Sequence, residues 1–437
     1  MSQVSHHGGV SHFPRTEPTS TTTTSPSPSP SDTATTSARR GFSHAAGFWV
    51  VAVAFLISMG FTVVTTPLWS IYQRQDDFST FMVTVAFATY AVGVLVSLFL
   101  AGHVSDWMGR RTVLLPAILI EALSAVIFIV WNDLPGLMVA RFVSGIGIGM
   151  ITATATAHIF ELHTRARPSS ARTRSDIVST AANIGGFAVG VIVASALVQF
   201  APDPTVTPFV VFLVLLLLAA LGVAFVPETV LVAAERRPYR PQRVRIPAAA
   251  RSRYLAAAVI AFAGFAVLGL FTALAPSFVA GQLHETSHLV GGSVVFATFA
   301  SAAVLQIGVR RFSSTIAVVI GVVLYVAGFA CVIAGVAAVS LALFVIGGIL
   351  AGGAAGILFS SAIGAAGQAA APESRGEALA GIFLSGYTGL VVPVVGLGAA
   401  TLAISMTAAL IAFAVIMVAI AVIGTIAFLR APAGSAD

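Results

Sequence analysis

The sequence has no lysine, a single cysteine and very little charge of either sign. Only 9% of its 437 residues are charged, whereas a soluble globular chain carries about 25%. A soluble protein this poor in charge would aggregate, so its apolar surface must face something other than water. The one cysteine, Cys331, excludes an intramolecular disulfide framework and a cysteine-based metal cluster. All 22 basic residues are arginines spread over many loops. Without one solvent-facing basic patch, a nucleic-acid partner is not expected.

Long apolar runs are what the chain has in abundance. Hydrophobic residues make up 57% of it, and the mean hydropathy is +0.98. A helix that crosses a bilayer needs about 20 consecutive apolar residues. The runs therefore predict an all-α polytopic membrane protein with twelve transmembrane helices. The expected spans are 46–68, 79–101, 112–131, 135–160, 176–200, 208–226, 253–279, 288–308, 314–338, 340–370, 376–400 and 404–429.

Two polar regions divide the chain into parts. Residues 1–45 are rich in Ser, Thr and Pro, cannot build a core, and are predicted to be disordered. They lack the early apolar run of a cleaved signal peptide. The longest polar break, 227–253, has six apolar segments on each side. The expected parts are a cytoplasmic tail at 1–45, a six-helix bundle at 46–227, a basic linker at 228–252, a second six-helix bundle at 253–430 and a cytoplasmic tail at 431–437.

The arginines predict the orientation of the chain, because cytoplasmic loops collect Lys and Arg. If the N-terminus is placed in the cytoplasm, 20 of the 22 arginines fall in cytoplasmic loops or tails. Of the other two, Arg74 lies outside and Arg141 lies within a span. We therefore expect a multi-pass protein of the cell membrane with both termini in the cytoplasm.

The second and third spans are joined by the charged stretch "GHVSDWMGRR", residues 102–111. Its pattern is Gly102-x3-Asp106-x2-Gly109-Arg110-Arg111. The glycines permit a tight turn, an aspartate suits the positive N-terminal end of a helix, and the arginines can pair with carboxylates. Spacing and location favour a conformational latch over a simple anchor that fixes the topology.

This loop closely resembles the signature of the major facilitator superfamily, although Trp107 stands where the family often has a basic residue. The stretches "RFVSGIGIG" (141–149), "VPET" (226–229) and "PESRGEALAG" (372–381) resemble other parts of that family. The resemblance implies two pseudo-symmetric six-helix bundles around a central cavity that work by alternating access. The second half keeps only a remnant of the loop signature, "QIGVRR" at 306–311, without the aspartate.

Three ionisable residues in or near the spans are candidates for function, since charge inside a membrane is costly. Glu121 lies near the middle of the third span, and Arg141 about six residues inside the outer end of the fourth. Their depths differ by only several Å at 1.5 Å per residue, so a proton-coupling ion pair is possible. A purely structural pair is the alternative. Glu161, at the cytoplasmic end of the fourth span, is expected to pair with Arg110, unless it is a solvated carboxylate at a helix end.

Other residues are candidates for lining the cavity or for close helix packing. The polar and aromatic cavity candidates are Tyr90, Asn183, Gln306, Tyr325, Gln368 and Tyr387, to which Trp69 and Tyr72 are added, although these two also suit interfacial anchors. The glycines expected to let helices approach closely are Gly145, Gly149, Gly186, Gly190, Gly348, Gly352 and Gly356.

The stretch 183–195 bears on the direction of transport. It partly resembles the Gly-x3-Gly-Pro-x2-Gly-Gly signature of the family's antiporters, with Gly186 and Gly190 in place. Val191 replaces the proline, and Ala194 and Ser195 replace the last glycines. The match favours export only weakly.

One motif points to another class of protein. "HETSH", residues 284–288, satisfies His-Glu-x-x-His, which on a helix places two zinc ligands on one face. It falls at an outer connection without an obvious third ligand, so an intramembrane zinc metalloprotease is only a remote alternative. No Walker-type phosphate loop is present.

The sequence thus predicts a secondary active transporter rather than an enzyme. The expected activity is proton-coupled efflux of a small amphipathic organic compound by alternating access. Uptake by a proton symporter or a uniporter of the same family is the alternative. The expected partners are a small-molecule substrate, protons and the lipid bilayer, with no cofactor and no metal, and the protein is expected to be a monomer.

Overall fold

The computed structural model describes residues 41–101, 104–230, 250–370 and 375–432, without the side chains of Ala101, Asp106 and Arg375. Over these ranges it has no strand, and twelve helical segments are long and apolar enough to cross a membrane. The predicted all-α fold with twelve spans is confirmed. Most of the predicted tail (1–40) and of the predicted linker (231–249) lies outside the described residues.

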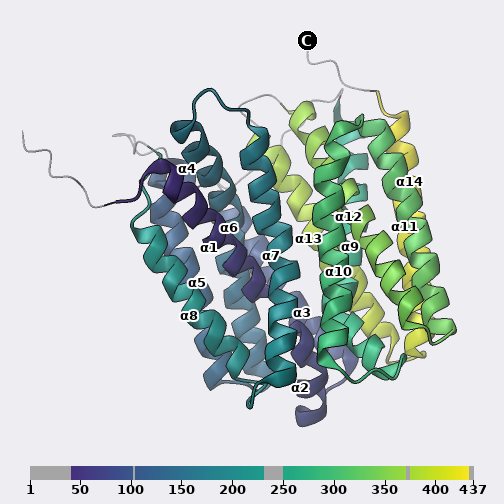
Figure 1. Cartoon of the computed structure of the whole chain (residues 1–437). Helices are drawn as coiled ribbons and strands as arrows, with labels where there is room; N and C mark the ends of the chain where they lie inside the picture. Colours follow the sequence, from purple (N-terminus) through teal and green to yellow (C-terminus); the bar gives the residue numbers. More distant parts are fainter. Residues whose placement is uncertain (1–40, 102–103, 231–249, 371–374, 433–437) are drawn as a thin grey trace, which may run out of the picture. The chain divides into compact units, whose positions relative to one another are not determined.

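The helices follow one another along the chain as labelled in Figure 1. Their bounds are α1 (His44–Thr62), η1 (Thr66–Leu68), α2 (Trp69–Asp76), α3 (Thr80–Ala101), α4 (Ser105–Met108), α5 (Arg110–Val130), α6 (Leu134–Ala166), α7 (Thr173–Phe200), α8 (Thr207–Ala224), α9 (Arg251–Gly281), α10 (His288–Gly308), η3 (Val309–Arg311), α11 (Ser314–Ala337), α12 (Leu341–Ala369), α13 (Arg375–Ala400) and α14 (Met406–Arg430).

The first span departs most from its predicted bounds. It runs from His44 to Asp76 as α1, η1 and α2, instead of ending at residue 68. α1 stops at Thr62, and Pro67 within η1 has no N–H with which to continue a helical ladder. α2 then carries the chain on to Asp77, which adopts a left-handed conformation (φ 51°) and ends the helix.

Short polar side chains begin many of the helices, because the first backbone N–H groups of a helix have no partner within it. Within a helix most of the other backbone groups bond to each other, which is why helices can cross a bilayer. The capping side chains that accept a hydrogen bond from the first turn are Ser43, Asp133, Ser287, Ser313, Ser340 and Ser405.

The helix contacts of the first six spans recur in the last six. In the first half α3 and α5 pack on α6, α1 packs on α6 and α7, and α8 packs on α1 and α5. In the second half α10 and α11 pack on α12, α9 packs on α12 and α13, and α14 packs on α9 and α11. Two further pairs, α7 with α10 and α3 with α13, join the halves. This repetition is the pseudo-symmetry of two six-helix bundles, which Figure 1 shows as purple-to-teal and green-to-yellow groups.

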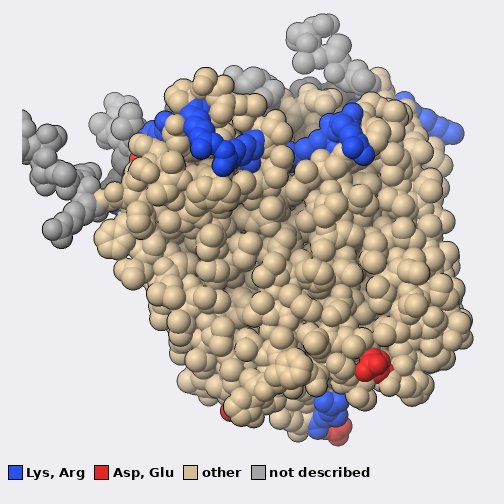
Figure 2. Space-filling view, in the orientation of Figure 1, with Lys and Arg blue, Asp and Glu red and all other residues tan. Residues whose placement is uncertain are grey.

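Charge is confined to the two ends of the spans on the face shown in Figure 2. Arginines gather at the end where α6 finishes and α7 begins, and we call this the arginine-rich end; Arg110, Arg172 and Arg310 belong to it. The sides between the ends expose large apolar residues such as Leu218 (58%) and Ile423 (65%). Apolar surface of this extent is stable only against lipid.

Candidate functional site

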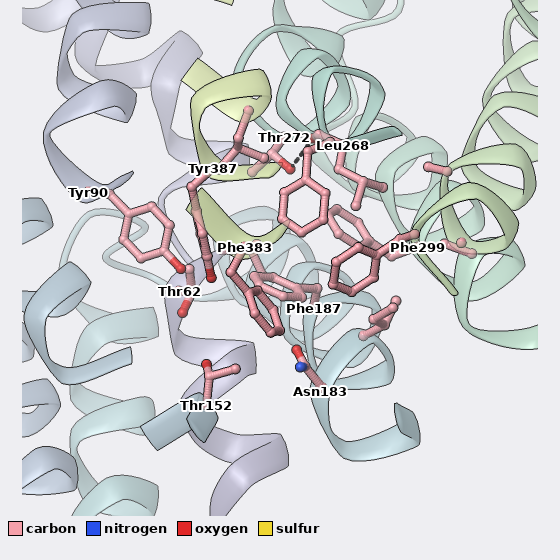
Figure 3. A pocket seen from close by; sticks show the side chains of 18 of the residues that line it. Thr62, Tyr90, Thr152, Asn183, Phe187, Leu268, Thr272, Phe299, Phe383 and Tyr387 are labelled. Atoms are coloured by element: carbon pink, nitrogen blue, oxygen red, sulfur yellow. Dashed lines mark hydrogen bonds between the residues drawn. The ribbon is translucent and has the colours of Figure 1, made fainter. Parts of the chain in front are cut away.

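An inner pocket lies between the two halves (Figure 3). Its lining comes from α1, α3, α6 and α7 of the first half and from α9, α10, α12 and α13 of the second. No residue that lines it in the described part of the chain is charged. Eight of its 19 lining residues are aromatic: Phe87, Tyr90, Phe187, Phe265, Phe299, Phe359, Phe383 and Tyr387.

The aromatic rings of the pocket pack against each other, both between the halves and within the second half. Phe187 of α7 stacks on Phe299 of α10, with ring centroids 5.0 Å apart. Phe265 of α9 meets Phe359 and Tyr387 edge to face, at 4.9 Å and 5.6 Å. Such contacts favour flat apolar ligands that can take part in the same stacking.

Few polar groups of the pocket are free to bind a ligand through a donated hydrogen bond. The hydroxyls of Thr62, Thr152 and Thr272 each donate to a backbone carbonyl one turn earlier in their own helix. The side-chain amide of Asn183 points into the pocket in Figure 3 and makes no such bond. Asn183 thus takes the cavity position that the sequence predicted, as do Tyr90 and Tyr387.

A wider vestibule joins the inner pocket to the arginine-rich end. Thr152, Asn183, Ile184, Phe359 and Phe383 line both spaces, so the two are continuous. The outer wall of the vestibule is polar, unlike the pocket. Its charged residues are Arg110, Glu161, Arg172, Asp176 and Arg310.

The opposite end of the spans holds the two halves together by polar contacts and close packing. Ser277 Oγ of α9 donates to Gln73 Oε1 of α2 at 3.4 Å. The backbone N–H of His288 donates to Gln199 Oε1 of α7 at 3.0 Å. Further in, Gly292 of α10 packs so closely on Ser195 of α7 that a Cβ atom there would overlap the serine. The cavity is therefore reached from the arginine-rich end.

Arg141 is buried next to the inner pocket (1% exposed) but does not line it. Its Nη1 donates to the backbone carbonyl of Thr62 at 2.7 Å. The guanidinium carbon lies 5.1, 5.4 and 5.8 Å from the ring centroids of Tyr90, Phe87 and Trp69. Its Nε and Nη2 have no hydrogen-bond partner. Aromatic faces and one carbonyl thus compensate for a charge that burial makes costly.

Glu121 is fully buried in α5, and the possible ion pair with Arg141 is not among the ion pairs of the described residues. Ser144 Oγ of α6 donates to Glu121 Oε2 at 3.0 Å, while Oε1 has no partner. The positions of the two residues along their spans correctly place them at a similar depth. The rotation of the helices, which depth does not determine, turned Arg141 toward α1 and Glu121 toward Ser144.

The loop predicted to act as a latch, residues 102–111, forms hydrogen bonds with the segment that follows α8. Gly109 has φ 103°, a region that residues with a side chain rarely adopt. A Cβ atom there would lie 2.6 Å from Glu228 Oε2. The Glu228 carboxylate accepts the backbone N–H groups of Arg110 (2.8 Å) and Arg111 (3.0 Å) at the start of α5. The carboxylate thereby caps α5 from a position 118 residues away along the chain.

Arg110 joins this loop to the end of α6. Its Nη2 and Nε donate to Glu161 Oε1 at 2.9 and 3.1 Å, and its Nη1 donates to Ser105 Oγ at 2.8 Å. The Thr229 hydroxyl donates to Glu161 Oε2. The structure thus brings Arg110 and Glu161 together as the sequence suggested. Charge-assisted bonds of this kind are among the stronger polar contacts in proteins.

Of the other residues of this loop, the structure describes the side chain of Arg111 but not that of Asp106. Arg111 Nη1 donates to the carbonyls of Ala224 and Val226, each at 3.3 Å, so it also holds the end of α8. Gly102 and the side chain of Asp106 lie outside the described residues. Whether the aspartate takes part in the latch stays a prediction.

Glu228 and Thr229 belong to the "VPET" motif, from which the sequence predicts no contact. Burial raises the pKa of the Glu228 carboxyl, but three hydrogen bonds from the backbone N–H groups of Val230, Arg110 and Thr229 outweigh it. With a smaller contribution from His158, they leave the pKa of Glu228 below its ordinary value of 4.5. The sequence assigned residue 228 to the linker, whereas here it docks on the first half.

The corresponding loop of the second half makes its contacts across the two halves. Arg310 Nη1 lies 3.6 Å from Asp176 Oδ2 of α7, and its Nη2 donates to Thr180 Oγ1 at 3.4 Å. Asp176 also faces Arg172 at 3.5 Å. The side chains of Arg310 and Asp176 are each 36% exposed. Neither residue was singled out from the sequence.

Two expected cavity residues lie elsewhere. Tyr325 is fully buried between α11 and α9, where its hydroxyl donates to the carbonyl of Ala263 at 2.8 Å. It lines neither the pocket nor the vestibule. Gln368 is exposed near the end of α12 and also lines neither space. Gln306 does line the vestibule, with a buried Oε1 atom that has no partner.

Trp69 and Tyr72 are neither interfacial anchors nor cavity residues. Both are almost fully buried, at 0% and 1% exposed. Their rings lie edge to face with centroids 6.3 Å apart, and Trp69 covers Arg141. They are core residues of the second part of the first span, after α1.

The predicted packing glycines all lie at helix contacts too close for a side chain. In the first half, Gly145 and Gly149 of α6 contact α3, and Gly186 and Gly190 of α7 contact α1. In the second half, Gly348, Gly352 and Gly356 of α12 contact α10. A Cβ atom at any of these seven positions would come within 3.0 Å of a neighbouring atom.

The His-Glu-x-x-His stretch is not helical. His284 adopts a left-handed conformation (φ 56°), and α10 begins only at His288. The two histidines are therefore not one turn apart on a helix, which the zinc motif requires. Among the described residues, no group of three or more His, Cys, Asp or Glu side chains is arranged to hold a metal ion.

Comparisons with known proteins identify the class to which this fold and cavity belong. The family model "Major Facilitator Superfamily" matches residues 48–317. The chain therefore belongs to the major facilitator superfamily, a family of transporters, and is a multi-pass membrane protein. The resemblance seen in the sequence motifs is confirmed.

One curated relative is similar over part of its length. The arabinose-proton symporter of Bacillus subtilis (strain 168) is 29% identical over 125 residues. The matched segment spans 27% of this chain and 27% of that relative.

Solved structures share the fold at low sequence identity. The human organic anion transporter MFSD10 (TETRAN) has a TM-score of 0.65 and 16% identity, covering 88% of this chain and 99% of that one. A bacterial homologue of the human lysosomal transporter Spinster, inward-facing and unoccupied, has 0.64 and 13%, covering 90% and 99%. The nucleoside transporter NupG has 0.65 and 13%, covering 88% and 99%. These similarities establish the fold alone.

Proposed function

We propose that this transporter exports small, flat amphipathic compounds in exchange for protons. The observation that carries the proposal is the inner pocket, which is aromatic, has no charged lining residue in the described chain, and continues into a vestibule open at one end. A sugar needs several side chains that donate and accept hydrogen bonds. Here three of the hydroxyls already donate to their own helices.

The arginine-rich end is proposed to face the cytoplasm of a cell-membrane protein, because Arg collects on that side. In this state the cavity is then open to the cytoplasm and closed to the outside. An amphipathic substrate can enter from the cytoplasm or from the inner leaflet of the bilayer. When the halves rock, the contacts at the outer end break and the vestibule closes.

Proton coupling is proposed to use the two buried charged residues. Glu121 Oε1 and Arg141 Nε and Nη2 each lack a partner in this state. Burial makes an ionised carboxylate costly unless it is paired, so Glu121 suits a group that takes up a proton in one state and pairs with Arg141 in another. The relative named as a proton symporter supports ion coupling but favours uptake. Symport is therefore the second candidate.

Transport by the purified full chain in liposomes separates these candidates. [14C]chloramphenicol serves as an aromatic amphipathic probe and [14C]arabinose as a sugar probe. We expect acid outside to accelerate the release of preloaded chloramphenicol about tenfold or more, with no accumulation of arabinose. Proton-driven accumulation of arabinose would instead establish symport. Transport of neither probe would contradict the proposed substrate class.

The variant Glu121→Gln tests the coupling residue. We expect chloramphenicol to bind as before, while its release no longer responds to the pH gradient, because the amide cannot carry the proton. Asp203→Asn, an exposed change in the connection between α7 and α8, is the control and should keep the gradient dependence. Unaltered dependence in Glu121→Gln would place the proton site elsewhere.

A further inference from the structure

One wall of the inner pocket differs from the rest because hydroxyl groups gather there. Tyr90 of α3, Tyr387 of α13 and Thr62 of α1 bring their side-chain oxygens close together (Figure 3). We call these three residues the tyrosine wall. The remaining pocket surface is mostly phenylalanine and aliphatic residues. A ligand that binds here therefore meets its polar contacts mainly at this wall and at Asn183.

The tyrosine wall has a buried hydroxyl without a partner. The Tyr90 side chain is 2% exposed, and its hydroxyl lies close to the side-chain oxygens of Thr62 and Tyr387 without a hydrogen bond of good geometry. The backbone carbonyl of Thr62 accepts Arg141 Nη1 at 2.7 Å. The Thr62 hydroxyl donates its proton to the carbonyl of Ser58 at 3.3 Å, so it has no proton left to offer a ligand. A buried hydroxyl that lacks a partner is costly, and a ligand atom can remove that cost.

The charge behind the wall decides what kind of ligand atom fits. The Arg141 guanidinium lies 5.1 Å from the centre of the Tyr90 ring and does not itself line the pocket. A positive charge at this distance favours an electron-rich atom at the tyrosine hydroxyl and disfavours a cationic group. A carbonyl oxygen offers lone pairs and partial negative charge without the desolvation cost of a full anion.

We infer that the tyrosine wall binds the carbonyl oxygen of the substrate, and that the substrate class is flat aromatic compounds bearing such a group. The Tyr90 hydroxyl donates to this oxygen and the Tyr387 hydroxyl lies ready to donate beside it. The aromatic part of the ligand then packs among the phenylalanines. This inference rests on the proposed function, because it takes the pocket to be the substrate site.

The test compares two ligands of the same shape, 2-acetylnaphthalene and 2-ethylnaphthalene, which differ by a carbonyl group in place of a methylene. Their binding to the purified full chain is measured by titration calorimetry in the same detergent. We expect the wild-type protein to bind the acetyl compound about five- to tenfold more tightly, the gain of one hydrogen bond to a buried donor. In Tyr90→Phe this preference should fall below about twofold, while the ethyl compound binds as before.

Two further variants keep the result interpretable. Tyr325→Phe removes a buried tyrosine hydroxyl outside the pocket and should leave the preference intact. Tyr387→Phe removes the second hydroxyl of the wall and should lower the preference by a smaller factor than Tyr90→Phe. If Tyr90→Phe is not folded, as judged by gel filtration, the loss of preference in Tyr387→Phe decides the question.

The outcomes separate the inference from the proposed function. Binding of both compounds by the wild type with no preference, or a full preference retained in Tyr90→Phe and Tyr387→Phe, would overturn the inference and leave the aromatic substrate site standing. Binding of neither compound would overturn the substrate site and the inference together.

Discussion

The two loops at the arginine-rich end that follow the second and the eighth span occupy related places in the two halves but make different contacts. The first is held within its own half, by Glu228 on the backbone at Gly109 and by the Arg110–Glu161 pair. The second reaches across to the other half through Arg310 and Asp176. The first loop is partly buried and has several short hydrogen bonds, while the second has one long, half-exposed ion pair.

This difference indicates two separate tasks. A network that joins α5, α6 and the end of α8 keeps one half rigid, so that it can move as a body. A weak contact between halves can break and re-form in each cycle at little cost. We therefore expect transport to be sensitive to substitutions that change the shape of the first half's loop. Substitutions in the second half's loop should have little effect on transport.

The sharpest test of the comparison substitutes a glycine in each loop. Gly109→Ala places a side chain at φ 103° and 2.6 Å from Glu228 Oε2, so both the turn and the carboxylate must shift. Such backbone strain costs on the order of 1–3 kcal/mol before the lost hydrogen bonds are counted. We expect chloramphenicol transport in liposomes to fall about tenfold or more.

The matched variant is Gly308→Ala. Gly308 has a helical conformation (φ −65°), and a Cβ atom there would meet no other atom within 4 Å. Its transport rate and thermal stability should equal those of the wild type. Equal loss in both variants would show that the two loops do not differ in the way proposed here.

A second prediction concerns pH and the Glu228 contact. The folded protein lowers the pKa of this carboxyl below 4.5, so its ionised form is favoured by folding. The resulting stabilisation is fully present above about pH 4.5 and is lost as the pH falls through the lowered pKa. We expect the detergent-solubilised wild type to lose thermal stability over that range.

In Glu228→Gln the contribution of this residue to the acid-induced loss should be absent. Its melting temperature should be lower than that of the wild type at pH 7, and the difference should narrow toward acid pH. A constant difference between the two proteins at all pH values would show that the charge of Glu228 does not contribute.

The sequence predicted the spans well because hydropathy reports the length of an apolar helix directly. It also predicted the Arg110–Glu161 contact, since the loop motif and the end of the fourth span lie at one membrane surface. It did not predict that Glu228 caps α5, because nothing local indicates a partner 118 residues away.

Helix rotation is what the sequence did not determine. Glu121 and Arg141 were placed at one depth, but Arg141 faces α1 and Glu121 faces Ser144. Tyr325 faces α9 instead of the cavity for the same reason. The chain has 30 phenylalanines, and an apolar helix with no polar face gives no sign of which of them line a cavity.

The smallest effect is expected from Asp176→Asn, which removes the ion pair between the halves. The pair has a separation of 3.6 Å, and both side chains are 36% exposed. Exposed pairs contribute at most about 1 kcal/mol, so the transport rate should change by less than about fivefold.

Salt provides the control, because exposed charges are screened over roughly 3 Å at 1 M ionic strength. The wild type at 1 M salt should then transport at the rate of Asp176→Asn, whereas the Gly109→Ala defect, which arises from shape, should persist at every salt concentration. If Asp176→Asn slows transport as much as Gly109→Ala does, the contact between the halves is as important to the cycle as the network within the first half. The same holds if 1 M salt does not reproduce the Asp176→Asn defect in the wild type.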